Sequence, residues 1–380
     1  MVNSVKRLCL TDDYFEPIKC MNNHSRKTYS TIDLPALLSN YTQIANLAPA
    51  SKTIAVIKAN AYGHGAIEIA KYLSPHVPAF AVAFIDEAIQ LRDAGITLPI
   101  LVIEGALSYQ DLSMALEHNF WLMVHSTEQM DWLKQFPTPY VGKLWLKIDT
   151  GMNRLGIKPC DVDGILAQLS PEQLESLVLC THFSSADELD NPKTQLQIQQ
   201  FEQVNEQHGY KKSLANSAGI LSWPKSHGDY NRLGLALYGA TPIPTNDLPV
   251  KLVHVMTLQS TIMALRKLKV GESVGYGETW QAKRPSVIAT VAIGYADGYP
   301  RNAKNGTPVY INGQIATLAG RVSMDMITID VTDIIDVSIG DSVELWGKNL
   351  AIETVAEHLD SNNYELLTRI SNRVPKFYIK

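Results

Sequence analysis

Between residues 53 and 238 the chain alternates short apolar segments with segments whose apolar residues follow a helical spacing. Strands that alternate with helices in this way imply right-handed crossovers and a parallel sheet. The number of such units favours a (β/α)8 barrel of the TIM type, an α/β fold, over an open doubly wound sheet, which is the structural alternative. The predicted strands cover residues 53–58, 80–84, 99–103, 120–124, 143–148, 177–182, 212–215 and 231–238.

Beyond about residue 252 the pattern changes to strands separated by turns, such as the one at Asn312-Gly313. Helical spacing returns only at residues 352–358. These features predict a second, mostly antiparallel β domain. We therefore expect three parts: a loose N-terminal extension (residues 1–26), the barrel domain (27–252, beginning with a strand at 29–34) and a C-terminal β domain (253–380).

The composition is that of a folded chain with a large core. Of the 380 residues, 46% are hydrophobic and 19% are charged, which excludes an intrinsically disordered protein. The net charge of −5 argues against a nucleic-acid-binding protein with a large basic surface. No apolar run approaches the roughly 18 residues that a membrane helix needs. The apolar stretch from Leu8 to Leu10 is too short for the core of a signal peptide. We therefore expect a cytoplasmic protein that binds neither membranes nor nucleic acid.

The four cysteines, Cys9, Cys20, Cys160 and Cys180, form no C-x-x-C pair and belong to no histidine cluster at zinc spacing. Four cysteines in a chain of this length do not make a disulfide framework. We expect reduced, mostly structural thiols and no metal site.

Three basic side chains stand at the predicted strand ends, where barrel enzymes place their chemistry. Burial lowers the pKa of a lysine, and a neutral amine such as that of Lys58 can bond to an aldehyde; the alternative is a surface lysine. Lys147 shares a strand face with Trp145 and is predicted to point inward, where it needs a negative partner or forms a structural ion pair. His182 is a candidate base, a cofactor contact or a hydrogen-bonded core histidine.

The last two predicted strands are followed by residues suited to an anion. Barrels often bind phosphate between these two loops, and Ser217 with the backbone near Gly219, Gly234 and Leu235 offers donors and close approach. Arg232 is either aimed at the ligand or part of a salt bridge across the barrel. A lysine, a phosphate cradle and an arginine in one barrel mouth suit pyridoxal phosphate.

The predicted β domain contains three polar, glycine-containing clusters, at residues 275–277, 294–301 and 320–326. In the first, Tyr276 stands between two glycines, where a core tyrosine would be poorly packed. We expect this side chain to be exposed, either for catalysis or as part of a recognition loop.

Five segments resemble the alanine racemase family of barrel-type (fold III) pyridoxal-phosphate enzymes, and the resemblance runs from about Thr28 to the C-terminus. The segment AVIKANAYGHG at residues 55–65 is similar to the family's cofactor-lysine motif. The other four are KIDTGMNRLG (147–156), THF (181–183), GYADG (294–298) and SMD (323–325). A chance match to all five is implausible.

The resemblance implies that the chain interconverts L-alanine and D-alanine by a two-base mechanism. Lys58 would bind the cofactor covalently and act as one base. Tyr276, supplied by the partner subunit, would be the second base on the opposite face of the substrate. Racemisation needs a base on each face, so the two residues make sense as a pair. The resemblance therefore also implies a homodimer with shared active sites.

The resemblance assigns binding roles to further residues. Arg232 would hydrogen-bond the pyridine nitrogen, and Arg154 would contact the cofactor and the substrate carboxylate. His182 would lie near the cofactor, and Lys147 would be carbamylated, giving a negative charge that orients Arg154. The phosphate would be held by Tyr62, Ser217, Gly234 and Leu235, and the substrate entrance would be bounded by Met324 and Tyr295 of the partner.

Two positions depart from the family pattern. Ser213 stands where many members have a histidine that supports the arginine, and Asn372 stands where many have a tyrosine near the phosphate and the substrate pocket. Related serine racemases carry asparagine at the latter place. A serine or broad-specificity racemase is therefore the alternative, although one pocket residue shifts specificity by only about 1–3 kcal/mol.

Three other functions fit the sequence less well. A barrel-type decarboxylase for basic amino acids would use a cysteine acid from the partner, but residues 253–380 contain no cysteine. A non-enzymatic pyridoxal-phosphate carrier would lack the second domain. An exported broad-specificity racemase would need a signal peptide. The physiological role, peptidoglycan precursor supply or alanine catabolism, stays open at this point.

Overall fold

The computed structural model describes residues 26–243 and 247–380. The chain forms two compact units, which are described separately. Ala36–Val253 is called the barrel unit; His254–Lys380, together with the N-terminal segment up to Pro35, is called the β unit. Of the expected loose extension, residues 1–26, only Arg26 lies within the described residues.

The barrel unit is built on an eight-stranded parallel sheet with the order β8-β7-β6-β5-β4-β3-β2-β9. The end strands approach each other, since the amide of Arg232 donates to the carbonyl of Ala215 at 3.0 Å, so the barrel is nearly closed. The predicted (β/α)8 barrel is confirmed and the open doubly wound sheet is not found. The strands are β2 (Lys52–Val56), β3 (Phe80–Val82), β4 (Ile100–Val102), β5 (Trp121–Val124), β6 (Leu144–Lys147), β7 (Val178–Cys180), β8 (Lys211–Ser213) and β9 (Tyr230–Leu233).

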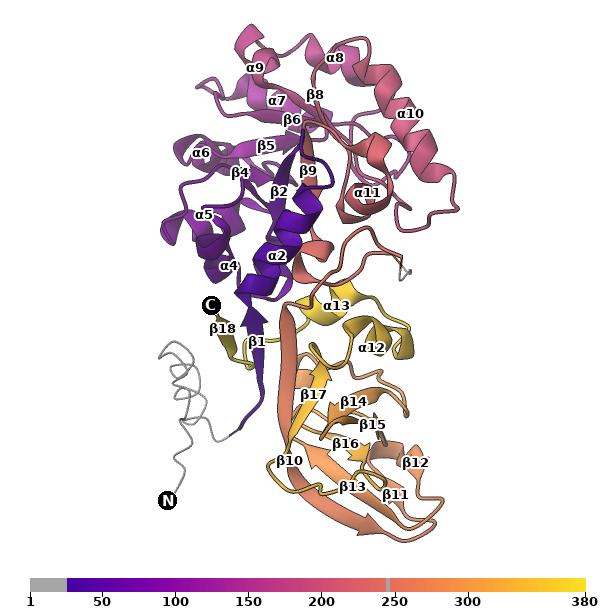
Figure 1. Ribbon diagram of the computed structural model, residues 1–380. Coiled ribbons are helices and arrows are strands. Elements are labelled where there is room, and N and C mark those ends of the chain that lie inside the picture. Colours follow the sequence, from indigo (N-terminus) through magenta and orange to yellow (C-terminus); the bar gives the residue numbers. More distant parts are fainter. Residues whose placement is uncertain (1–25, 244–246) are drawn as a thin grey trace, which may run out of the picture. The chain divides into compact units, whose positions relative to one another are not determined.

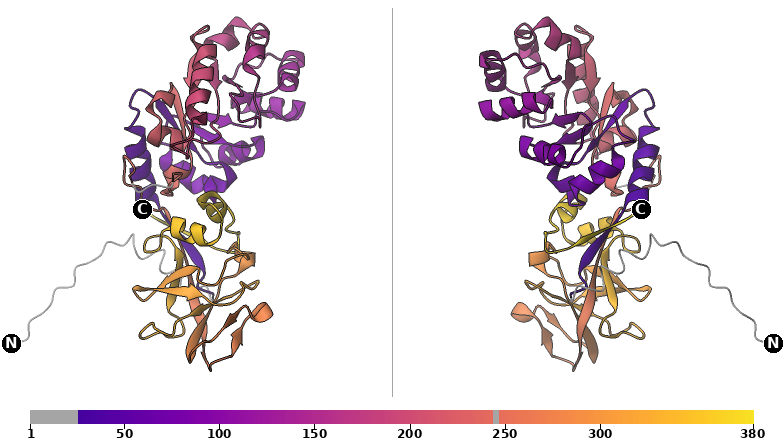
Figure 2. Two further views of the ribbon diagram at one scale, coloured as in Figure 1. Left: turned by 90° about the vertical axis from the view of Figure 1, so that its right-hand side faces the viewer. Right: turned by 90° about the vertical axis from the view of Figure 1, so that its left-hand side faces the viewer.

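Most of these strands are short runs of buried apolar residues, as in β3, β4 and β7. Such runs are typical of parallel sheets because both faces are covered. The helices lie outside the strands in each view (Figures 1 and 2). They are α2 (Leu34–Ala45), α4 (Ala66–Leu73), α5 (Ile85–Asp93), α6 (Tyr109–Glu117), α7 (Thr127–Gln135), α8 (Val162–Leu166), α9 (Pro171–Ser176), α10 (Lys193–Asn205) and α11 (Ser217–Ser222), with the short turn α3 (Lys58–Tyr62) following β2.

The β unit contains a mostly antiparallel sheet with the order β13-β16-β15-β14-β17-β10-β1-β18, in which β13 also pairs with β10. The extra pairing folds the sheet back on itself. The predicted turn at Asn312-Gly313 is present, with φ of +46° and +81°. The strands are β1 (Tyr29–Asp33), β10 (Met256–Leu268), β13 (Ser286–Val291), β14 (Pro308–Ile311), β15 (Gln314–Leu318), β16 (Ile327–Asp330), β17 (Ser342–Trp346) and β18 (Lys376–Ile379), beside the small pair β11 (Ser273–Val274) and β12 (Trp280–Gln281).

The strand β1 differs from the expected domain division. The sequence analysis grouped residues 27–252, whereas β1 pairs antiparallel with β10 and parallel with β18, so it belongs to the β unit. Its side chains alternate between buried and partly exposed positions, a pattern that fits a strand in any sheet with one covered face. The local pattern therefore predicts the strand but not the sheet in which it pairs.

Of the two α-helices described in the β unit, one was predicted and one was not. α12 (Ile352–His358) has the predicted bounds. α13 (Asn363–Thr368) was not predicted, because six mostly polar residues carry little periodicity. It begins at Asn362, whose side chain accepts the amide of Glu365 at 2.9 Å. Among the residues that the structure describes, no helix is long and apolar enough to cross a membrane.

Candidate active site

The predicted cofactor residues lie at one end of the barrel strands. Lys147 is the last residue of β6, Lys58 and His182 follow β2 and β7 by two residues, Arg232 lies in β9, and Ser217 begins α11 after β8. Because the strands are parallel, their carboxyl ends share one face, which is where barrel enzymes carry their chemistry. The structure thus brings this group together within one unit.

Lys58 is half-buried and opens the turn that ends at Tyr62. The ring of Tyr62 stacks on that of Tyr238, with the centroids 4.9 Å apart. Tyr238 is itself fixed, since its hydroxyl donates to the carbonyl of Val56 in β2 at 2.9 Å. The turn after β2 and the segment after β9 are therefore joined by two tyrosine rings.

Ser217 and Gly234 form the candidate phosphate cradle. The Ser217 hydroxyl accepts the amides of Gly234 at 3.0 Å and Ala236 at 3.3 Å. A Cβ at Gly234 would lie 2.7 Å from the Tyr62 hydroxyl, so only glycine keeps this space open. Leu235, the next residue, is buried. The space beside Gly234 is small and is bordered by hydroxyl groups that can donate hydrogen bonds, which suits an anion.

Arg232 is only 6% exposed and its terminal nitrogens are fully used. Nη1 donates to the carbonyl of Ser213 at 2.8 Å and to its hydroxyl at 2.6 Å. Nη2 donates to the carbonyls of Thr181 at 2.6 Å and Leu214 at 3.1 Å. Burial lowers the pKa of the guanidinium. Ser213, noted as a departure from the family pattern, thus contacts the arginine directly, and the side chain is held in one orientation.

Lys147 is 6% exposed, and burial is the main reason that its pKa is lowered, with Arg232 and Arg154 adding to the effect. Cys180 and Glu104 act in the opposite direction. Burial raises the pKa of the Cys180 thiol to about 11, so the thiol is neutral at pH 7. The burial of Lys147 is consistent with the predicted inward orientation. Its lowered pKa means that the neutral amine is more populated than in a solvent-exposed lysine.

The pKa of His182 lies well below its usual value, first because of burial and then because of Arg232, Lys147, Arg154 and Lys58. A histidine in this state is neutral at pH 7. The surrounding cations give this end of the barrel a positive potential, which attracts anions such as phosphate and carboxylate.

Arg154 is exposed, at the end of a loop that Asp149 organises. One oxygen of Asp149 accepts the amides of Gly151, Met152 and Asn153, each at 3.0 Å. Gly151 and Asn153 have φ of +114° and +57°. The sequence analysis missed Asp149, although an aspartate before a glycine and an asparagine is a known signal for such a turn.

Gln197, in α10, joins the loops after β6 and β7. It is fully buried. Its amide nitrogen donates to the hydroxyl of Thr150 and to the carbonyl of His182, both at 3.1 Å, and its oxygen accepts the amide of Ser184 at 3.0 Å. The hydroxyl of Thr150 also lies 2.8 Å from that of Thr181. Sequence reasoning missed this residue; its signal is a glutamine on the buried face of a helix.

The remaining predicted residues, Tyr276, Tyr295 and Met324, lie in the β unit and are exposed, Tyr276 by 70%. Within this unit the three predicted clusters adjoin. A Cβ at Gly277 would lie 3.4 Å from Nη1 of Arg321. The amide of Tyr295 donates to the carbonyl of Ser323 at 3.0 Å.

A buried carboxylate fixes the turn that carries Tyr295. Asp297 is fully buried and forms an ion pair with Arg26 at 2.6 Å. It also accepts the amide of Gly294 at 3.0 Å. A Cβ at Gly294 would lie 2.3 Å from the carbonyl oxygen of Met324, so the turn requires glycine. In the described part of the chain, no group of three histidine, cysteine or acidic residues is arranged to hold a metal.

Comparisons with known proteins match nearly the whole chain to one family. The family models "Alanine racemase, N-terminal domain" and "Alanine racemase, C-terminal domain" match residues 32–242 and 255–378. An alanine racemase of Alteromonas mediterranea is 48% identical over 352 residues, which are 93% of this chain and 98% of that protein.

Solved structures give the same result. The biosynthetic alanine racemase of Pseudomonas aeruginosa is 40% identical with a TM-score of 0.89, covering 93% of this chain and 99% of that one. An alanine racemase of Bartonella henselae, described with covalently bound pyridoxal phosphate, is 31% identical with a TM-score of 0.85, covering 93% and 99%. With both family models matched along nearly its full length, this chain belongs to the alanine racemase family.

Proposed function

We propose that this chain interconverts L-alanine and D-alanine with pyridoxal phosphate as its cofactor. The observation that carries the proposal is the placement of Lys58, Arg232 and the Ser217–Gly234 cradle at one end of the barrel strands. An amine, an anion cradle and a rigid cationic donor are the groups that an aldehyde phosphate with a ring nitrogen requires.

The residues fit the cofactor. Gly234 keeps open a space bordered by the hydroxyls of Tyr62 and Ser217, and these groups with Leu235 would hold the phosphate. Arg232 would meet the ring nitrogen with its Nε–H, because Nη1 and Nη2 already donate two hydrogen bonds each. Because a guanidinium can only donate hydrogen bonds, it favours a ring nitrogen that stays unprotonated. His182, being neutral, would pack near the cofactor without adding a charge of its own.

Two residues of the chain are assigned as bases. Pyridoxal phosphate, when bound, draws electron density from the α-carbon of the amino acid and so makes its proton removable. The amine of Lys58 takes or returns the proton on one face of the α-carbon, and the hydroxyl of Tyr276 does so on the other. Arg154 holds the substrate carboxylate, and Tyr295 and Met324 border the entrance.

Tyr276 is proposed to act on the site of a partner subunit in a homodimer. Its exposure of 70% supports the assignment, because such a side chain is available to a second copy of the chain. Co-expression of Lys58→Ala and Tyr276→Phe subunits tests it. If sites are shared, random pairing restores about a quarter of the sites, one in each mixed dimer. No recovery in purified mixed dimers, or a fully active monomer, would contradict sharing.

Lys147 is proposed to be carbamylated. The amine nitrogen would attack the carbon of carbon dioxide and release one proton, forming an N-carboxylate. A lowered pKa favours the neutral amine that reacts, and Arg232 and Arg154 nearby would stabilise the negative product. In carbon-13-labelled bicarbonate the enzyme should show a carbamate resonance that Lys147→Met lacks. Its absence from the parent enzyme would contradict the modification.

The decisive experiment on function is chiral chromatography of L-alanine, L-serine, L-lysine and L-arginine incubated with the enzyme and pyridoxal phosphate. We expect fast conversion of alanine and much slower conversion of serine. Comparable turnover of serine would make Asn372 a specificity determinant and the enzyme a broad-range racemase. Carbon dioxide release from lysine or arginine without racemisation would support a decarboxylase instead.

A further inference from the structure

The segment that follows Lys58 has an unusual backbone. Ala59, Asn60, Ala61 and Tyr62 have φ of +51°, +54°, +53° and +50°, a complete left-handed turn without glycine. The left-handed conformation costs roughly 1–2 kcal/mol for each L-residue other than glycine, and of these three residue types only asparagine adopts it readily. The turn therefore needs support from the surrounding structure.

One carboxylate, that of Glu87 in α5, supports the start of the turn. Its Oε1 accepts the amide of Ala59 at 2.6 Å. Its Oε2 accepts the amides of Ala83 at 2.7 Å and Phe84 at 3.4 Å in the segment between β3 and α5. Both oxygens are thus used, and the peptide immediately after Lys58 is tied to the neighbouring βα segment.

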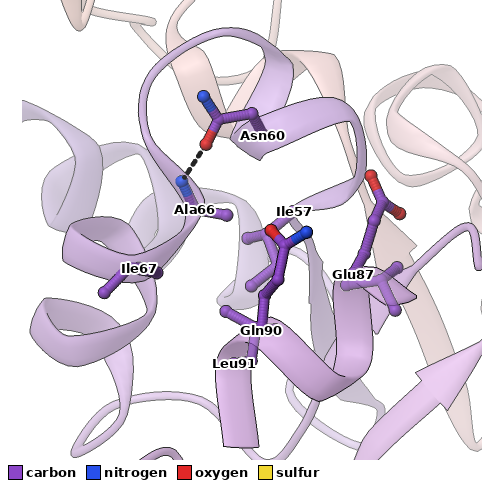
Figure 3. A pocket seen from close by; sticks show the side chains of 8 residues that line it. Ile57, Asn60, Ala66, Ile67, Glu87, Gln90 and Leu91 are labelled. Atoms are coloured by element: carbon purple, nitrogen blue, oxygen red, sulfur yellow. Dashed lines mark hydrogen bonds between the residues drawn. The ribbon is translucent and has the colours of Figure 1, made fainter. Parts of the chain in front are cut away.

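The packing beside the turn is loose. A cavity of about 210 Å³ is lined by Ile57, Asn60, Ala66, Glu87 and Leu91, among others. Figure 3 shows Asn60 and Glu87 at its edge, with the side chain of Asn60 accepting the amide of Ala66 at 2.8 Å. Because protein interiors are normally close-packed, the hydrogen bonds rather than side-chain packing hold the turn on this side.

We propose that Glu87 is a positioning residue for the racemisation reaction: by fixing the peptide between Lys58 and Ala59, it sets the direction in which the lysine side chain leaves the backbone. The inference rests on the proposed function, in which the amine of Lys58 bonds to the cofactor and moves the α-proton. A small misplacement of such a group lowers the rate without unfolding the protein.

The test compares Glu87→Gln with Asp86→Asn in the full-length enzyme loaded with pyridoxal phosphate. The glutamine has one acceptor oxygen in place of two, and its NH2 group can only donate. Either Ala59 or the segment before α5 therefore loses its acceptor. Asp86 is exposed and lies in the same first helical turn, while the acceptor of the Ala59 and Ala83 amides is Glu87. Both variants lose one negative charge near the start of α5, so charge alone affects them equally.

For Glu87→Gln we expect kcat to fall about tenfold and KM to change less than about twofold, the pattern of a misplaced reacting group. Release of the cofactor during dialysis, followed by its visible absorption, should be several times faster. Urea unfolding should stay close to that of Asp86→Asn. Values of kcat and cofactor release within twofold of that control would overturn the proposal, as would a loss of kcat explained wholly by the unfolded fraction.

A second substitution tests whether Glu87 acts through the turn. Glycine adopts positive φ without strain, so adding Ala59→Gly to Glu87→Gln should recover several-fold of the lost kcat and slow cofactor release. No recovery would count against the proposal. The parent enzyme is assayed in parallel: a parent that does not racemise alanine overturns the proposed function, whereas an active parent with an unaffected Glu87→Gln overturns the positioning role alone.

Discussion

Arg232 in the barrel unit and Tyr276 in the β unit are both assigned to the same reaction, yet their surroundings differ. The guanidinium of Arg232 is buried and donates four hydrogen bonds within its own unit. The side chain of Tyr276 is 70% exposed, and only its backbone is constrained, between Gly275 and Gly277. The barrel unit thus holds the side chain of Arg232 by hydrogen bonds within the unit. The β unit instead leaves the side chain of Tyr276 exposed at the end of a loop.

The largest effect should come from the barrel side. In the proposed function Lys58 both binds the cofactor covalently and acts as one base, so Lys58→Ala should lower racemisation by roughly 10⁴-fold or more. Borohydride reduction followed by mass spectrometry should show the added cofactor mass on the parent and none on the variant. A variant that retains a tenth of the parent rate would show that another residue holds these roles.

The next effect should come from the exposed side. Tyr276→Phe removes the hydroxyl and leaves the loop intact, so racemisation should fall by roughly 10²–10³-fold with unchanged thermal unfolding. Lys58 remains, so exchange of the α-proton with deuterated water should continue for one enantiomer only, as followed by proton NMR. Equal loss of exchange for both enantiomers would argue against one base on each face.

A smaller effect should follow from the buried network. Gln197→Leu removes the hydrogen bonds to the Thr150 hydroxyl, the Ser184 amide and the carbonyl of His182, of which Thr150 keeps Thr181 as a partner. The free energy of unfolding should therefore fall by about 1–3 kcal/mol. The matched control is Gln199→Leu, an exposed position on the same helix, which should stay within about 0.5 kcal/mol of the parent. Urea titrations measure both, and equal values for the two variants would contradict a structural role for the network.

The smallest effect concerns pH. The pKa of His182 is lower in the folded state than its unfolded value near 6.5, so the unfolded state binds the proton more readily. This group's contribution to stability is therefore present above pH 6.5 and is lost as the pH falls below it, by up to about 1.4 kcal/mol per pH unit. Urea midpoints between pH 7 and pH 5 should fall less steeply for His182→Gln. An identical slope would show that His182 does not titrate differently on folding.

The comparison of the two units also shows what sequence can predict. The barrel strands were found because short buried apolar runs are a local signal, and the strand ends then located Lys58, Lys147 and His182. The strand β1 was found but grouped with the barrel, because pairing with β10 and β18 depends on residues more than 200 positions away. The local sequence pattern predicts that a segment is a strand, but the sheet it joins is decided by pairing with distant segments.

The supporting residues were harder to predict than the residues they support. The sequence predicts a strand that ends at Lys58 and says nothing of the backbone beyond it, which forms a left-handed turn at residues 59–62 held by Glu87. Gln197 likewise acts through hydrogen bonds to other segments, those that carry Thr150, His182 and Ser184. Such partners are set by three-dimensional proximity, which residue type and spacing do not encode.

The pairing of β1 has a consequence for how the chain is made. The barrel unit is inserted between β1 and β10. Its synthesis is therefore complete before most strands of the sheet that β1 joins have been made. One neighbour of β1, the strand β18, is synthesised after every other strand of that sheet. The barrel can therefore fold during translation before either neighbour of β1 has been made. A truncation after Pro375 would deprive β1 of one partner while leaving every strand of the barrel in the chain.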